Sequence, residues 1–243
     1  MTEASIVLSA VSLSKSFGST LAVSGITVTI SSNEVVALAG GNGSGKTTLL
    51  KMIAGTLIPD SGYLALDGRR LTPGNPHSRR LEGIEMVYQD CALCPDCSVL
   101  ENLFLGREII TKLGFLNLTD MRHQARAMIA HYGFAIPNLR IATKYLSGGQ
   151  QKAVAIGRSL LSGPRVLLLD EPTASLGVKE QDTILGTLGE LRSSGVGVVF
   201  CTHSPRDILA VADRVLVLRV GELVHDRSLQ GVSETELAIM MSS

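Results

Sequence analysis

Residues 40–48 read Gly40-Gly41-Asn42-Gly43-Ser44-Gly45-Lys46-Thr47-Thr48, and this stretch decides the fold of the chain. Its first eight residues fit the pattern G-x-x-x-x-G-K-[ST], whose glycines let consecutive backbone N–H groups face phosphate oxygens. The pattern needs a strand before it and a helix after it. The expected strand over residues 34–38 contains the apolar run Val35–Leu38, typical of a buried strand, and we expect a helix to begin near Gly45. The stretch therefore predicts a nucleotide site in an α/β fold.

The side chains at the end of this loop carry specific expectations. Lys46 is predicted to reach the β- and γ-phosphates, and the Thr47 hydroxyl is predicted to be a magnesium ligand. The remaining backbone is predicted to hold phosphate at Gly40, Gly41, Asn42, Gly43, Ser44, Gly45 and Thr48. The alternative is a flexible glycine- and serine-rich turn, which the strand and helix on either side disfavour.

A second apolar run, residues 166–169, ends in Asp170 and Glu171. A carboxylate at this position, Asp170, can hold Mg²⁺ opposite Thr47, usually through water, because magnesium keeps part of its hydration shell. Glu171 can polarise the water that attacks the γ-phosphate, a role that the reaction needs separately. An apolar strand followed by Asp-Glu is also a common structural pattern, so its meaning depends on the loop upstream.

Residues 146–150, Leu-Ser-Gly-Gly-Gln, precede a helix expected over residues 151–161. A Ser-Gly-Gly cap offers a hydroxyl, free N–H groups and the positive end of a helix dipole, which together favour an anion. One helix terminus contributes at most about 2 kcal/mol. This second anion site can therefore complete a catalytic centre but cannot form one alone.

The other elements expected from the sequence surround a helical stretch. They are antiparallel strands over residues 7–14 and 26–30, strands over 63–66 and 198–201, a helix capped by Thr119 or Asp120 and stopped by Gly133, a helix over 179–191, a hairpin over 214–224 and a helix over 234–241. Residues 73–80 are polar and contain proline, so we expect a surface connection there. The pattern predicts an α/β core with a mostly helical insertion near residues 91–163.

The order of the loop, Leu146–Gln150 and Leu167-Leu168-Leu169-Asp170-Glu171-Pro172-Thr173 resembles the ATPase subunits of ATP-binding cassette (ABC) transporters over essentially the full length. The resemblance implies a P-loop NTPase core of ABC ATPase type, with an antiparallel β subdomain and an inserted α-helical subdomain. It implies one ABC ATPase domain over residues 1–243. Residues 1–90 and 164–243 would form the nucleotide-binding core with the β subdomain, and residues 91–163 would form the helical subdomain that carries the Leu-Ser-Gly-Gly-Gln signature.

The same resemblance implies ATP and Mg²⁺ as cofactors and a second copy of the chain as a partner. In that family two subunits pair head to tail, so that the signature of one closes over the ATP held by the other. Ser147, Gly148, Gly149 and Gln150 would then act on the nucleotide of the partner.

Three further positions resemble residues with family roles. Phe17 looks like the aromatic that stacks on adenine, although a core strand phenylalanine is the alternative. Gln89 looks like the glutamine that touches magnesium and senses the membrane partner, whereas an exposed amide without such a role is the alternative. His203 looks like the histidine that contacts the γ-phosphate, against the alternative of a structural histidine.

One position departs from the family pattern. Most members place an aspartate after Ser-Ala-Leu, whereas this chain reads Ala174-Ser175-Leu176-Gly177. The aspartate helps communication between paired sites in the family, so Gly177 puts the coupling of the two hydrolysis events in doubt.

Two segments resemble the ATPases of bacterial monosaccharide importers of the ribose, xylose and fructose type. They are Gln89-Asp90 followed by residues 98–108, and residues 176–180. Many of those ATPases fuse two cassettes, whereas this chain carries one, so two copies would serve one transporter. The resemblance implies integral membrane permease subunits as partners and an extracytoplasmic solute-binding protein as an indirect one.

The apolar stretch 104–118, interrupted by Arg107, Glu108 and Lys112, lies where the family docks on a membrane subunit. The alternative is ordinary core of the helical subdomain. We expect the coupling surface near residues 89–107.

Composition and charge limit the remaining possibilities. Lys plus Arg number 22 and Asp plus Glu number 22, so no net charge attracts nucleic acid, and we expect no nucleic-acid partner. Residues 1–5 lack the features of a secretory signal, and no apolar run approaches the roughly 20 residues that span a bilayer. We expect a cytoplasmic chain, peripheral on the inner face of the cell membrane.

Cys91, Cys94 and Cys97 form a C-x-x-C-x-x-C run that could ligate a metal. An iron–sulfur run of this spacing would add a fourth cysteine and a proline, but Glu101 and Asn102 stand at those positions. Structural zinc wants four ligands, so we favour three ordinary thiols.

The sequence thus favours an ATPase that powers solute import, and we expect the solute to be a monosaccharide, without an indication of which one. A cassette ATPase for another solute or for export is the alternative. A soluble ABC protein acting on DNA or ribosomes is a remote third hypothesis, because the charge is balanced and only about 100 residues separate Lys46 from Ser147.

Overall fold

A computed structural model describes residues 5–242 of the chain. The prediction that no secretory signal is present rested on residues 1–5, and the first four of these lie outside the described residues. The elements, in chain order, are β1 (Ile6–Phe17), β2 (Thr20–Ser31), β3 (Val35–Ala39), α1 (Lys46–Ile53), β4 (Ser61–Leu66), β5 (Arg69–Arg70), α2 (Pro76–Leu81), β6 (Ile84–Val87), α3 (Val99–Phe104), α4 (Leu118–His131), the short 3₁₀ helix η1 (Thr143–Tyr145), α5 (Gly148–Leu160), β7 (Val166–Asp170), α6 (Val178–Ser193), β8 (Gly197–Cys201), α7 (Pro205–Val211), β9 (Arg214–Arg219), β10 (Glu222–Ser228) and α8 (Glu234–Ser242).

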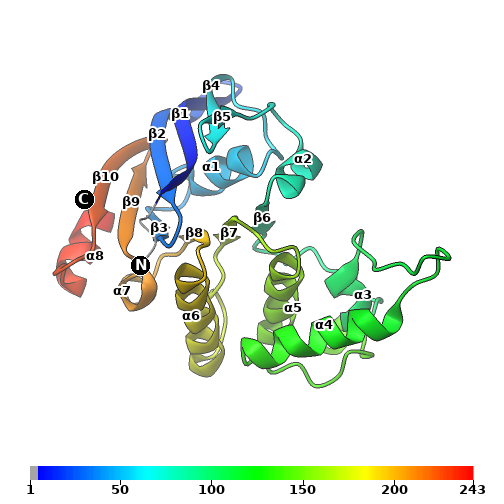
Figure 1. Cartoon of the computed structure of the whole chain (residues 1–243). Coiled ribbons are helices and arrows are strands. Elements are labelled where there is room, and N and C mark those ends of the chain that lie inside the picture. Colours follow the sequence, from blue (N-terminus) through cyan, green and yellow to red (C-terminus); the bar gives the residue numbers. More distant parts are fainter. Residues whose placement is uncertain (1–4, 243) are drawn as a thin grey trace.

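Two sheets form the frame of the molecule. The larger has the strand order β10-β9-β3-β8-β7-β6, in which every pair except β10 and β9 is parallel. The smaller has the order β2-β1-β4-β5 and is antiparallel. Figure 1 shows the antiparallel sheet above α1, and α3, α4 and α5 set to one side of both sheets. This is the predicted α/β core with an antiparallel β subdomain and a helical insertion.

The central strands are apolar on both sides because both faces of the larger sheet are covered. Alternate residues of β3 enter different cores: Val35 and Ala37 belong to the cluster shared with α5 and α6, whereas Val36 and Leu38 pack with α1 and the antiparallel sheet. All five residues of β3, β7 and β8 are buried. A strand covered on two faces gains from burying every side chain, which explains the continuous apolar runs.

Residues 73–80 were expected to be a surface connection, but α2 occupies much of this segment. The Asn75 side chain caps the helix by accepting from the Ser78 backbone N–H at 3.1 Å, and Pro76 stands in the first turn, where its missing N–H costs nothing. Arg79 is only 2% exposed, and its guanidinium donates to the Thr72 carbonyl at 2.8 Å. Burial of this arginine stem is a tertiary effect that composition does not reveal.

The cap predicted for α4 was wrong by two residues or more. Asn117, rather than Thr119 or Asp120, caps the helix, and its Oδ1 accepts from the Asp120 backbone N–H at 3.2 Å. The inner face of the helix is formed by Met121, Ala125 and Met128, which are buried. Gly133 follows the helix with a φ of 64°, the left-handed conformation in which glycine commonly ends helices.

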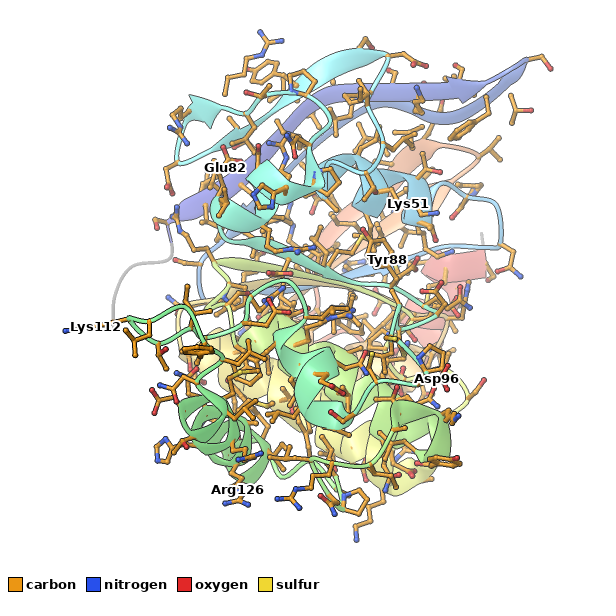
Figure 2. The ribbon with its side chains drawn as sticks, turned by 90° about the vertical axis from the view of Figure 1, so that its right-hand side faces the viewer. Lys51, Glu82, Tyr88, Asp96, Lys112 and Arg126 are labelled. Carbon is orange, nitrogen blue, oxygen red and sulfur yellow. The ribbon has the colours of Figure 1, made fainter. Side chains whose placement is uncertain are left out.

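The apolar stretch 104–118 is not core, so the alternative prediction of subdomain core was wrong for most of it. Only Phe104 is buried; Leu113 is 82% exposed and Phe115 is 71% exposed. Residues 105–117 form an irregular projection with one bridge between Ile110 and Leu116. Figure 2 shows Lys112 at its outer end. Across residues 5–242, no helix is both long and apolar enough to cross a membrane.

Candidate nucleotide-binding site

The loop between β3 and α1 is pressed against two neighbouring strands at its two ends. Gly40 has a φ of 136°, and a Cβ there would stand 2.1 Å from the Leu218 carbonyl oxygen. Gly45 has a φ of 104°, and a Cβ there would stand 2.3 Å from the Ala22 carbonyl oxygen. Both conditions exclude any side chain. The glycines therefore fix the loop close to the sheet with its backbone free to face a ligand.

Lys46 begins α1 and turns its side chain back along the loop. Its Nζ donates to the Gly40 and Gly41 carbonyl oxygens, each at 2.9 Å. Burial lowers the pKa of Lys46, while the acidic groups of Cys201, Glu171 and Asp170 act in the opposite direction. A buried ammonium held only by neutral carbonyls is poised to take an anionic partner.

Thr47 and Asp170 meet although 123 residues separate them. The Thr47 hydroxyl donates to Asp170 Oδ1 at 3.3 Å, across the gap between α1 and the end of β7. Asp170 is 4% exposed. A hydroxyl beside a buried carboxylate is the hard-oxygen donor set that Mg²⁺ prefers. Among residues 5–242 the buried Ser44 hydroxyl of the same loop has no hydrogen-bond partner, so its donor is available to an oxygen atom of a ligand.

Glu171 lies between two other predicted site residues. Its Oε1 is 2.9 Å from His203 Nε2, and its Oε2 accepts from Gln89 Nε2 at 3.3 Å. These residues follow β7, β8 and β6, whose carboxyl ends share one edge of the parallel sheet. Three chain segments thus converge on one carboxylate.

These side chains share a single cleft of about 620 Å³. It is lined by Phe17, Ala22, Asn42, Gly43, Ser44, Gly45, Lys46, Thr47, Thr48, Gln89, Glu171 and His203. Phe17 ends β1 and is 52% exposed, so the alternative prediction of a core phenylalanine was wrong. Ala22 was missed by sequence reasoning, because its place here depends on how β2 packs on the loop.

The signature residues do not line this cleft. Ser147 caps α5 and forms a reciprocal capping box with Gln150, in which each side chain bonds the other's backbone N–H. Ser147 and Gly148 are exposed at this helix end. Ser147, Gly149 and Gln150 line a separate cleft of about 310 Å³, which Lys179 and Glu180 of α6 also line. Within one chain, the two predicted anion sites are distinct.

Sequence reasoning also missed two basic residues of α5 that hold the segment after Gln89. Lys152 is 5% exposed, and its Nζ donates to the Gln89 carbonyl at 3.0 Å. Arg158 donates to the Cys91 and Ala92 carbonyls at 3.0 and 2.8 Å. Cys91 and Ala92 have φ of 60° and 44°, a costly conformation for residues with side chains.

The cysteine run does not form a three-thiol cluster. Cys91 is buried, whereas Cys94 and Cys97 are partly exposed. Among residues 5–242, no three His, Cys, Asp or Glu side chains are grouped so that they could hold a metal ion.

Gly177 stands immediately before α6, where the family pattern has an aspartate. A Cβ at this position would lie 2.5 Å from Glu180 Oε2. The same glutamate side chain would meet a Cβ on Gly149 at 2.8 Å. Glu180 therefore fills the space beside Gly177 and packs against the signature helix of its own chain.

Comparison with known proteins places this geometry in a family. The ABC transporter family pattern matches residues 23–174. The chain is 38% identical over 229 residues to a xylose/arabinose import ATP-binding protein of Sulfolobus acidocaldarius, covering 94% of this chain and 91% of that one. It is 37% identical to a fructose import ATP-binding protein of Rhizobium meliloti, covering 88% and 85%. A ribose import ATP-binding protein of Burkholderia thailandensis is 38% identical, but the chain spans only 43% of its length.

Solved structures agree with the fold. A dimeric ATP-binding cassette in a post-hydrolysis state, bound to ADP and Pi, superposes with a TM-score of 0.81 at 26% identity, covering 92% of this chain and 99% of that one. The protein cbiO1 of Clostridium perfringens, part of the ABC transporter complex cbiONQ, superposes with a TM-score of 0.79 at 30% identity, covering 96% of this chain and 92% of that one. The chain belongs to the ABC transporter family and is its ATP-hydrolysing cassette.

Proposed function

We propose that this ATPase powers the import of a sugar, specifically a monosaccharide, through a membrane permease. The observation that carries the proposal is one cleft lined by the loop together with Glu171, Gln89 and His203, with Asp170 hydrogen-bonded by Thr47 of that loop. Three similar relatives, which by their names import xylose or arabinose, ribose and fructose, support a sugar as the solute.

In this proposal the loop backbone and Lys46 bind the phosphates of ATP. The Lys46 ammonium exchanges its two carbonyl partners for phosphate oxygens, so its charge gains a stronger partner. Thr47, Asp170 and Gln89 hold Mg²⁺, which neutralises phosphate charge when bound. Phe17, exposed at the rim of the cleft, offers its ring to adenine.

Glu171 orients and polarises the water that attacks the γ-phosphate. Its carboxylate is fixed by His203 on one oxygen and Gln89 on the other, which leaves little freedom to turn away. His203, in contact with Glu171, also contacts the γ-phosphate in this scheme. Arrival of the phosphate gives both residues a new partner.

A second copy of the chain completes the site. The exposed end of α5 supplies Ser147, Gly148, Gly149 and Gln150 to the ATP held by the other copy, head to tail. The separation of α5's end from the cleft within one chain supports this arrangement. Residues 91–163 would then act as the arm that carries the signature, on the core formed by residues 1–90 and 164–243.

The proposed docking surface for the permease, at the inner face of the membrane, extends from the segment expected near residues 89–107 over the projection 105–117 to Leu118 at the start of α4. Six of the large apolar side chains in residues 105–118 are exposed by 40% to 82%, namely Leu105, Ile110, Leu113, Phe115, Leu116 and Leu118. Such an apolar group on one projection is uncommon on a protein that works alone. An extracytoplasmic solute-binding protein would act through the permease, without contact to this chain.

Uptake in cells tests the proposal. Replacing the chromosomal copy with Glu171→Gln should abolish uptake of labelled xylose, ribose or fructose, whereas Glu222→Gln, an exposed glutamate on β10, should leave uptake unchanged. Phe115→Ser should reduce uptake while the purified protein still hydrolyses ATP. Unchanged uptake of all three sugars, with loss of another solute's transport, would favour the alternative of a different solute or of export. Loss of a DNA or ribosome function would favour the remote alternative.

A further inference from the structure

Cys94 and Cys97 occupy one turn between β6 and α3, and Figure 2 labels Asp96, which lies between them in the sequence. The turn is closed by the Cys97 backbone N–H, which donates to the Cys94 carbonyl at 3.2 Å. The two sulfur atoms are 2.8 Å apart, with the Cys97 thiol donating to Cys94 Sγ. Both cysteines are partly exposed. The two thiols are therefore in contact and accessible.

A fully buried asparagine holds this turn. Asn102 is 0% exposed, and its Oδ1 accepts from the Cys94 backbone N–H at 2.8 Å. Its Nδ2 donates to the Cys94 and Cys97 carbonyls at 3.0 and 3.2 Å. Thr143, 1% exposed, donates its hydroxyl to the Cys94 carbonyl at 2.8 Å and its N–H to the Cys97 carbonyl at 3.0 Å.

This framework bonds the backbone of the turn and none of its bonds involves a sulfur atom. Burying an amide side chain is costly unless its polar atoms are satisfied, and Asn102 satisfies them on the cysteine turn. The thiols are consequently brought together by the fold rather than by their own attraction. A pair held in this way reacts as if each thiol were at a high effective concentration for the other.

We propose that Cys94 and Cys97 form a site of reversible thiol–disulfide exchange with a small-molecule disulfide such as oxidised glutathione. The Cys94 thiolate attacks one sulfur of the oxidant, forms a mixed disulfide and releases one small thiol. The Cys97 thiolate then attacks Cys94 Sγ and releases the second small thiol. In balance, one small-molecule disulfide is reduced to two thiols, and two cysteines lose their protons and two electrons to form one S–S bond.

The order of the two steps follows from the hydrogen bond. The Cys94 sulfur accepts the Cys97 proton, and this bond raises the pKa of Cys97 to about 11. Cys97 is thus the later thiolate, and Cys94 is the first nucleophile. Burial raises the pKa of Cys91 and of Cys201, so neither competes for the oxidant.

The test is equilibration of the whole protein in glutathione buffers of graded ratio, followed by acid quench, alkylation and peptide mass spectrometry. The wild type should form a Cys94–Cys97 cross-link that dithiothreitol reverses, with Cys91 and Cys201 still alkylated. Cys97→Ser should accumulate glutathione on position 94, because the second thiol is absent. Cys91→Ser, the matched control, should behave as the wild type.

A synthetic peptide of residues 90–100 measures what the framework contributes. It should need at least about a tenfold higher ratio of oxidised to reduced glutathione for half-oxidation, because it lacks Asn102 and Thr143. Equal ratios for peptide and protein, or stable glutathione adducts on both cysteines of the wild type, would overturn the proposal. The test uses no transport or ATPase readout, so its outcome is independent of the proposed function.

Discussion

Glu171 has a backbone φ of 49°, a conformation that residues with side chains rarely adopt. Such strain costs about 1–3 kcal/mol and persists only where the surrounding structure imposes it. Here β7 ends immediately before the residue, and His203 and Gln89 bond its carboxylate from two sides. The carboxylate is therefore fixed by both its backbone and its neighbours before any ligand arrives.

At the same scale, Lys46→Ala should weaken ATP binding by roughly tenfold to a hundredfold, since a hydrogen bond to a charged group contributes about 1.5–3 kcal/mol. Isothermal titration with ATP measures the change. Lys51→Ala is the matched control, because Lys51 lies on the same helix with its side chain exposed. ATP affinity within twofold of the wild type for Lys46→Ala would contradict the assignment of this lysine to the phosphates.

The ion pair of Asp67 with Arg165 gives a pH-dependent prediction. Its two N–O distances are 2.6 and 2.7 Å, and these bonds lower the pKa of Asp67. A carboxylate with a lowered folded pKa stabilises the protein above its unfolded pKa of about 3.9, and the contribution is lost as pH falls through the folded value. Asp67→Asn should cost about 1 kcal/mol or less at pH 7, because both side chains are about half exposed.

Urea unfolding at pH 7 and at pH 3 measures this difference. Asparagine tolerates the positive φ of 47° at this position, so the substitution changes charge and little else. The gap between wild type and variant should shrink at the lower pH. A gap that grows on acidification would show that Asp67 acts by another route.

At the scale of elements, local sequence predicted the type of most helices and strands, and tertiary contact decided the exceptions. The buried strands β3, β7 and β8 were found because sheets covered on both faces demand continuous apolar runs. Helix α2 was missed because its stability depends on the burial of Arg79, which sequence rules place outside. The cap of α4 was misplaced because several capping residues stand close together, and only the backbone path selects Asn117.

Helix α5 offers an element-scale prediction through Arg158. Arg158→Met removes both hydrogen bonds to the Cys91 and Ala92 carbonyls while keeping an apolar stem. We expect the free energy of unfolding to fall by about 1–3 kcal/mol, because the left-handed turn loses its support. Arg126→Met on the exposed face of α4 is the control. Urea unfolding of both variants decides, and equal stability would mean that the turn is self-supporting.

At the scale of the whole molecule, the parallel sheet explains why residues far apart in sequence share one cleft. Strand order places the ends of β6, β7 and β8 side by side, so Gln89, Glu171 and His203 meet without any local signal of contact. Motif spacing predicted these residues one at a time. It could not predict Ala22, Lys152 or Arg158, whose positions arise from packing between separate elements.

The proposed pairing of two chains gives the whole-molecule prediction. Glu171→Gln keeps the shape of the side chain but removes its charge, so ATP should bind, stay unhydrolysed and hold a dimer. Light scattering after size exclusion, with saturating ATP, measures the mass, and Glu222→Gln should hydrolyse ATP as the wild type does. A Glu171→Gln protein that stays monomeric and hydrolyses ATP at the wild-type rate would refute the mechanism.

Helix α5 begins at the signature, and its Lys152 and Arg158 side chains donate hydrogen bonds to the carbonyls of Gln89, Cys91 and Ala92. In the proposed dimer, α5 would thus contact the partner's nucleotide with its N-terminus and Gln89 of its own chain through Lys152. In a dimer with twofold symmetry, the two α5 helices would therefore connect each ATP site with the other, so that binding at one site could affect the position of Gln89 at the other. This connection offers a route for coupling the two hydrolysis events that does not need an aspartate at position 177.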